Sequence, residues 1–169
     1  MRFPCDFSFE VQVTTGMKRH LISTAIGLLC CVASGCSSPT SPVDEQALSR
    51  AEARWASRAF DSYSYKTVTS CGLCPSDRAR QTRVEVRGGK VSAAIVVAND
   101  SLLPTATSFP TVDGMFAQIR GYTRDAGVRE VRVQYDPQLG YPTSINVFAK
   151  AGIMDGDYGT SVSNLVPTP

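Results

Sequence analysis

The chain has 169 residues, which suits one domain of ordinary size, and its 17 lysines and arginines nearly balance its 15 aspartates and glutamates. This near neutrality excludes the strongly basic surface of a nucleic-acid-binding protein. The only histidine, His20, lies in a segment that we expect to be removed. The remaining chain therefore lacks the residues for a Ser-His-Asp or Cys-His catalytic set and for the usual zinc sites.

Residues 17–35 have the pattern of a bacterial lipoprotein signal peptide. Lys18 and Arg19 provide a basic start, and the apolar run over residues 21–33 is shorter than the about 20 apolar residues of a membrane-spanning helix. Residues 1–16 are neither basic nor periodically apolar. We interpret them as an upstream extension from a misassigned start codon, so that translation begins at the methionine that opens the signal peptide.

Cys36 is the predicted lipidation site. Ser34 and Gly35 place small residues before this cysteine, which resembles the cleavage site of bacterial lipoproteins, although Ala33 stands where leucine is usual. The alternative is a soluble secreted protein that is cleaved nearby. We predict a cell-envelope protein held in the membrane by the lipid on Cys36. If the host has two membranes, Ser37 favours the outer membrane, facing the periplasm.

The mature chain is predicted to begin with a flexible tether over residues 36–44, which is rich in serine, proline and threonine. A single domain over residues 45–166 follows. Its first element is a helix that opens at Asp44 and Glu45 and runs to about Phe60. Apolar residues recur there at steps of three and four and form one stripe, which consists of Leu48, Ala51, Trp55 and Ala59.

Three strands are predicted next. Residues 63–70 alternate and are rich in β-forming residues, and residues 82–87 alternate with Val84 and Val86 on one side. Gly88-Gly89 is typical of a two-residue hairpin turn, because a type I′ turn needs positive φ at both positions. Residues 91–97 form the returning strand.

A second helix is predicted after the loop over residues 99–110. Thr111 is a good N-cap, and Asp113 lies in the first turn, where its carboxylate meets the helix dipole and is interpreted as structural. Ala126-Gly127 is predicted to end the helix with an αL glycine. The buried stripe is expected to consist of Val112, Met115, Phe116, Ile119 and Tyr122.

Three further strands complete the domain. Residues 131–135 alternate, the segment 136–142 turns the chain, and residues 143–149 return. Residues 158–165 form a last, weaker strand. The order helix-βββ-helix-βββ with short connections predicts an α+β fold, in which an antiparallel sheet carries two helices on one face.

Cys71 and Cys74 are the first candidate site. An oxidising envelope favours a disulfide between them, and no other cysteine remains in the mature chain once Cys36 is acylated. The alternative is a thiol–disulfide redox motif of the CxxC type. We favour the structural disulfide, because Pro75 follows a strand-like segment and no βαβ pattern surrounds the motif.

The turn around Asp136 is the second candidate site. Tyr135, Asp136 and Tyr141 are predicted to present a carboxylate and two phenols at a hairpin tip, where they would form a ligand or partner surface. The alternative, which we favour, is turn chemistry. Aspartate accepts local backbone hydrogen bonds, Pro137 restricts φ, and Gly140 permits positive φ.

Motifs along the chain resemble a known group. The chain is similar to an uncharacterised family of secreted bacterial lipoproteins, a domain of unknown function, over most of residues 51–165. The resemblance implies one compact domain and supports the lipoprotein interpretation, but it implies no activity and no catalytic residues. It depends on Trp55…Phe60-x-x-Tyr63-x-Tyr65, Cys71-x-x-Cys74, Phe109-Pro-Thr-Val-Asp113-x-x-Phe116 and Tyr135-Asp136-Pro137-x-x-Gly140-Tyr141-Pro142-Thr143.

Our leading hypothesis is a lipid-anchored, non-enzymatic interaction or accessory module of the cell envelope, without a cofactor or a metal. Its partners are the membrane, through the lipid, and a candidate envelope protein. The first alternative is the redox protein that uses Cys71 and Cys74. The second is a peptidase-inhibitor-like or ligand-binding module built on the sheet face, for which we expect a concave apolar patch rimmed by charge.

Overall fold

The structure is a computed structural model that describes residues 43–72, 74–153 and 156–169. The predicted upstream extension, the signal peptide, Cys36 and all of the tether before Val43 lie outside the described residues. Within the described ranges, neither α-helix is both long enough and apolar enough to cross a membrane.

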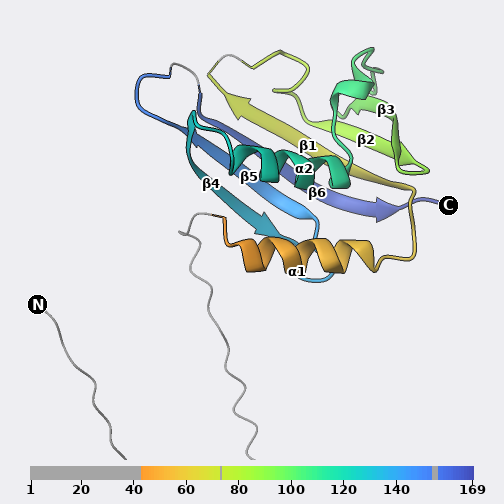
Figure 1. Cartoon of the computed structure of the whole chain (residues 1–169). Coiled ribbons are helices and arrows are strands. Elements are labelled where there is room, and N and C mark those ends of the chain that lie inside the picture. The colour runs from red at the N-terminus through yellow and green to blue at the C-terminus, as the bar shows by residue number, and fades with distance from the viewer. Residues whose placement is uncertain (1–42, 73, 154–155) are drawn as a thin grey trace, which may run out of the picture. The chain divides into compact units, whose positions relative to one another are not determined.

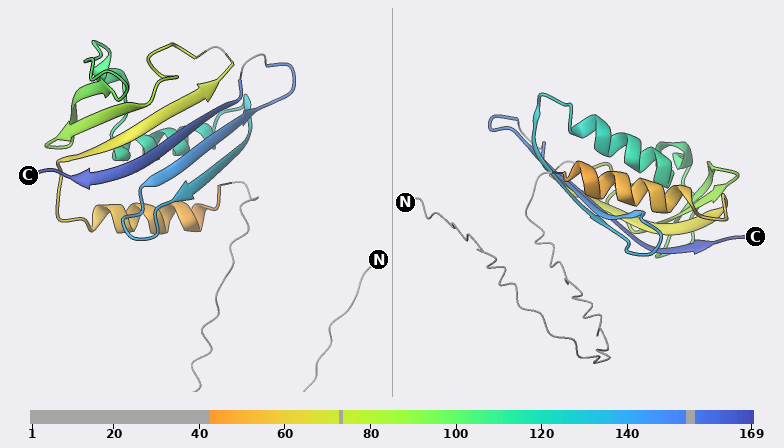
Figure 2. Two further views of the ribbon diagram at one scale, coloured as in Figure 1. Left: turned by 180° about the vertical axis from the view of Figure 1, so that it is seen from behind. Right: turned by 60° about the horizontal axis from the view of Figure 1, so that its bottom comes forward.

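The architecture confirms the predicted α+β class and the order helix-βββ-helix-βββ. One antiparallel six-stranded sheet has the strand order β3-β2-β1-β6-β5-β4, and both helices pack against the same face of it (Figures 1 and 2). The elements are α1 (Glu45–Ala56), β1 (Tyr63–Cys71), β2 (Thr82–Arg87), β3 (Lys90–Val96), the short 3₁₀ helix η1 (Ala106–Ser108), α2 (Val112–Tyr122), β4 (Val128–Tyr135), β5 (Pro142–Ala149) and β6 (Tyr158–Pro167).

The last strand joins the two halves of the sheet. β6 has 10 residues and pairs with β1 on one side and β5 on the other, whereas the sequence pattern indicated only a weak terminal strand. Figure 1 shows β6 at the centre of the sheet, between the meander β1-β2-β3 and the hairpin β4-β5. The first and last strands of the domain are therefore neighbours.

α1 begins as predicted but ends earlier. The Asp44 carboxylate accepts a hydrogen bond from the Gln46 N–H at 2.9 Å and caps the first turn. Leu48, Ala51 and Trp55 are buried, but the helix ends at Ala56, so the predicted extension to Phe60 and the burial of Ala59 are wrong. Beyond the helix end, the Phe60 ring packs edge-on against Trp55, with ring centroids 5.9 Å apart.

α2 also starts at the predicted cap and stops before the predicted end. The Thr111 hydroxyl accepts a hydrogen bond from the Gly114 N–H at 3.0 Å. The helix ends at Tyr122, and Gly127 does not adopt a positive φ, so the predicted glycine cap is wrong. Instead, the Asp125 carboxylate accepts the Gly127 N–H at 2.7 Å and turns the chain toward β4.

The hairpin between β2 and β3 forms as predicted. Gly88 and Gly89 have φ of +54° and +72°, which matches the requirement of a type I′ turn. Thr82, Val84 and Val86 alternate toward the helices and are buried.

An ion pair links the two helices above this core. The Arg120 guanidinium of α2 contacts both carboxylate oxygens of Glu52 in α1, at 2.8 and 2.5 Å.

Candidate functional site

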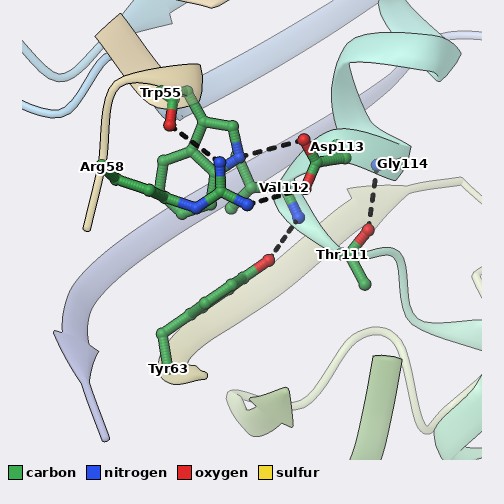
Figure 3. Close-up of polar contacts among 7 residues, drawn as sticks. All are labelled: Trp55, Arg58, Tyr63, Thr111, Val112, Asp113 and Gly114. Atoms are coloured by element: carbon green, nitrogen blue, oxygen red, sulfur yellow. Dashed lines mark hydrogen bonds and ion pairs between the residues drawn. The ribbon is translucent and has the colours of Figure 1, made fainter. Parts of the chain in front are cut away.

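Residues from the first and third motifs of the resemblance meet where α1 passes the start of α2. The Trp55 indole N–H donates to Asp113 Oδ1 at 3.2 Å (Figure 3). The Arg58 guanidinium lies 4.0 Å from the centre of the Trp55 ring and donates to Asp113 Oδ2 at 3.3 Å. Asp113 thus has the structural role that its position predicts, and it also binds α1, a contact that the sequence analysis did not anticipate.

Two buried tyrosines of β1, Tyr63 and Tyr65, form hydrogen bonds with the backbone at the start of α2. The Tyr63 hydroxyl accepts the Val112 N–H at 3.0 Å, and the Tyr65 hydroxyl donates to the Pro110 carbonyl (Figure 3 shows the former). Burial raises the pKa of both phenols above the ordinary value. The aromatic and acidic parts of the motif therefore hold the start of α2 in place.

The predicted surface around Asp136 is mostly turned inward. Asp136 Oδ1 accepts the N–H groups of Gln138 and Leu139, at 3.0 and 2.7 Å. Tyr141 is only 8% exposed, and the Tyr135 ring stacks against Phe116 with centroids 6.3 Å apart. The favoured turn chemistry accounts for these contacts of Asp136, and the role of the three residues as a partner surface stays a prediction.

Tyr135 carries a buried polar atom. Its hydroxyl has no hydrogen-bond partner among the described residues, and burial raises the pKa of the phenol. Both effects follow from its place at the end of β4, beneath α2.

Cys71 and Cys74 form a disulfide with Cα atoms 5.2 Å apart. Cys71 is the last residue of β1, and the chain then turns back so that the Thr69 N–H donates to the Arg78 carbonyl at 2.9 Å. In the described part of this loop no helix begins after either cysteine, so no helix N-terminus stabilises a thiolate there. The disulfide closes a turn at the end of a central strand.

We expect this disulfide to resist reduction, with a reduction potential below about −300 mV, as in structural disulfides of secreted proteins. The reason is that β1 and the returning segment at Arg78 hold Cys71 and Cys74 close together when they are reduced. The measurement is thiol alkylation and mass spectrometry after equilibration in glutathione and dithiothreitol buffers. A potential above about −200 mV would contradict the structural role and favour the redox alternative.

A cavity of about 250 Å³ lies between α2 and the sheet. Its floor comes from β1, β5 and β6, its roof from α2, and one wall from the loop after the disulfide and the segment before α2. The lining residues are Thr67, Thr69, Ile145, Tyr158 and Thr160 from the sheet, Met115, Gln118 and Tyr122 from α2, and Arg78, Phe109 and Pro110 from the wall.

The polar side-chain groups of this cavity are hydroxyls, the Gln118 amide and one guanidinium. The hydroxyls of Thr69 and Thr160 lie 3.2 Å apart, and burial raises the pKa of the Tyr158 phenol above its ordinary value. Arg78 stacks over the Phe109 ring, 4.6 Å from its centre. Among the described lining residues there is no carboxylate. One arginine in a polar loop carries no pattern, so the sequence gives no signal for Arg78.

Two other surfaces are less enclosed. A shallow hollow of about 390 Å³ lies at the disulfide end of the sheet, where Gly159 leaves space between Ser70 and Asn146. The large exposed apolar residues are Leu102, Ile153 and Val166, which belong to the loop after β3, the loop before β6 and the end of β6. No group of three or more metal-ligating side chains gathers anywhere in the described ranges.

Comparison with known proteins yields a family. The model of a family of unknown function, DUF6174, matches residues 47–167. No curated protein matches the chain, and no solved structure matches it.

Proposed function

The chain belongs to this family of unknown function, and because the family's description assigns no activity, we propose from the residues that it is a lipid-anchored cell-envelope protein that acts as a non-enzymatic interaction or accessory module. The observation that carries the proposal is the sequence Ser34-Gly35-Cys36 after a short apolar run with a basic start. The lipid on Cys36 supplies the membrane contact.

The layout of the chain supports an anchored module. Between Cys36 and the first residue of α1, Glu45, lies the tether, which spans at most about 30 Å when fully extended. A folded domain on such a tether works close to the membrane surface, where a second envelope protein or a ligand of the periplasm is within reach.

Lipidation is tested by growing the host with a fatty-acid analogue and detecting label on the protein. We expect the wild type to be labelled and Cys36→Ala to lose the label completely, because the acylated thiol is gone. Cys31→Ala is the matched control, since Cys31 lies in the same signal peptide but follows large apolar residues. Equal labelling of Cys36→Ala and the wild type would overturn the anchor.

A second candidate function is thiol–disulfide exchange by Cys71 and Cys74. The observation that favours it is that Cys71 lines the shallow, open hollow at the disulfide end of the sheet. The disulfide would accept two electrons from a substrate dithiol, which becomes a disulfide while its two protons pass to the two cysteine thiols. The reduction potential described above distinguishes this candidate from the structural role.

A further inference from the structure

We propose that the cavity between α2 and the sheet binds a small carboxylate, and that Arg78 is the charged partner of the ligand. This site would give the proposed envelope module a ligand, and it does not depend on the lipid anchor. Four features of the cavity support it: its size, its charge, the way Arg78 is held, and the hydroxyls of its floor.

The size fits a small molecule. A cavity of about 150 Å³ is enough to hold benzene, so a cavity of about 250 Å³ has room for one ring or a short branched chain together with a carboxylate. Met115 and Ile145 are buried and provide apolar contact for the body of such a ligand.

The charge fits a monoanion. Arg78 is the one charged residue in the lining described above. The Asp77 carboxylate is not part of the lining; it accepts a hydrogen bond from the Thr105 hydroxyl at 2.7 Å, and this bond lowers the pKa of Asp77. Asp125 is engaged by the Gly127 N–H. A single guanidinium neutralises a single negative charge, and enclosing the second charge of a phosphate dianion without a partner is costly.

Arg78 is held in place by its own turn, by β1 and by the segment before α2. Its backbone N–H donates to the Pro75 carbonyl at 2.9 Å, and its carbonyl accepts the Thr69 N–H at 2.9 Å, so the turn after the disulfide is tied to β1. Its guanidinium stacks on Phe109 and donates to the Ser108 carbonyl. A guanidinium has five N–H groups, and the others remain available to a carboxylate.

The floor supplies further hydrogen-bonding groups. Thr67 is only 6% exposed, and the Thr69 and Thr160 hydroxyls face each other across the β1–β6 pair. Hydroxyls donate to carboxylate oxygens and rotate to suit a ligand. A carboxylate held by Arg78 therefore has hydroxyl donors in the same cavity.

The test is a titration with 4-fluorobenzoate, followed by ¹⁹F NMR, of the protein purified in detergent from its own host. Micelles without protein provide the baseline. We expect saturable binding, at least tenfold weaker binding by Arg78→Gln, and binding within twofold of wild type by Arg80→Gln. Arg80 is the matched control, because it is an exposed arginine of the same loop that does not line the cavity.

A second variant and two further probes keep the result independent of folding at Arg78. Gln118→Glu places a carboxylate on the exposed α2 side of the cavity and is expected to weaken binding at least tenfold through repulsion. The neutral 4-fluorobenzamide and the dianionic 4-fluorophenyl phosphate are both expected to bind at least tenfold more weakly than the carboxylate.

The site itself is checked through the Met115 methyl resonance, which is expected to move on addition of 4-fluorobenzoate. The proposal is overturned if binding does not saturate by 10 mM, if Arg78→Gln and Arg80→Gln bind equally, or if the Met115 methyl stays unmoved. Each of these outcomes is separate from loss of fatty-acid labelling, which concerns the anchor alone.

Discussion

Val162→Asp is expected to destabilise the domain by more than about 4 kcal/mol and, in a domain of marginal stability, to unfold it. Val162 is 3% exposed and lies in β6, where it pairs with Thr67 of β1 and belongs to the core under the helices. An aspartate there buries a carboxylate without a cationic partner in the strand that joins the two halves of the sheet. Urea unfolding followed by circular dichroism measures the effect.

Ser163→Asp is the matched control for this prediction. Ser163 is the next residue of β6, is exposed on the opposite face, and pairs with Lys66 of β1, so its new carboxylate lies beside a cation in water. We expect a change within about 0.5 kcal/mol. If Val162→Asp costs no more than Ser163→Asp, β6 is not the central strand.

Gly140→Ala is expected to cost at least about 3 kcal/mol. Gly140 has φ of +82°, and a Cβ built there lies 2.3 Å from the Ala51 carbonyl oxygen and 3.0 Å from Arg54 Cβ. The backbone conformation alone costs an alanine about 1–2 kcal/mol. The contact adds the cost of moving the β4–β5 turn away from the backbone of α1. Thermal and urea unfolding measure the loss.

Gly88→Ala measures the cost of the backbone conformation without the contact of the new Cβ with α1. Gly88 also has a positive φ, of +54°, but a Cβ there meets no atom within 4 Å. We therefore expect only the conformational cost, about 1–2 kcal/mol. Equal effects at Gly88 and Gly140 would show that the approach of the turn to α1 contributes nothing.

Local patterns were enough to predict most of the elements. Alternation in residues 82–87 and the Gly88-Gly89 pair determine the β2–β3 hairpin, because the turn type and the inward side chains depend only on neighbours in the chain. The caps at Asp44 and Thr111 are local in the same way, since each side chain accepts a hydrogen bond from the backbone within three residues.

The ends of the helices were less predictable. After Ala56 and after Tyr122 the backbone tightens into a turn, in which the Arg58 and Arg124 N–H groups donate to carbonyls three residues back. Helical periodicity continues past both points in the sequence. Contacts that compete with the helix decide where it ends, and these contacts have no periodic signature.

The candidate sites also differ in how far the sequence alone could predict them. Pairing of Cys71 with Cys74 follows from their spacing and from the cysteine content, and the structure contains the disulfide. Alternation over residues 131–135 indicates that Tyr135 faces inward, but the Phe116 ring that stacks on it comes from another element and has no signal in that pattern. The cavity beside Arg78 is also built from segments far apart in the chain.

By itself, the sequence determined the α+β class, the order of the elements, the β2–β3 hairpin turn, the helix starts and the cysteine pair, and it supports the proposed lipid anchor at Cys36. Only the tertiary structure decided that β6 lies between β1 and β5, that Trp55 binds Asp113, and which side chains enclose the cavity under α2. The physical reason is the distance along the chain over which each effect acts. Periodicity, capping and turn chemistry act over a few residues, whereas strand order and cavity walls depend on packing between residues far apart in the chain.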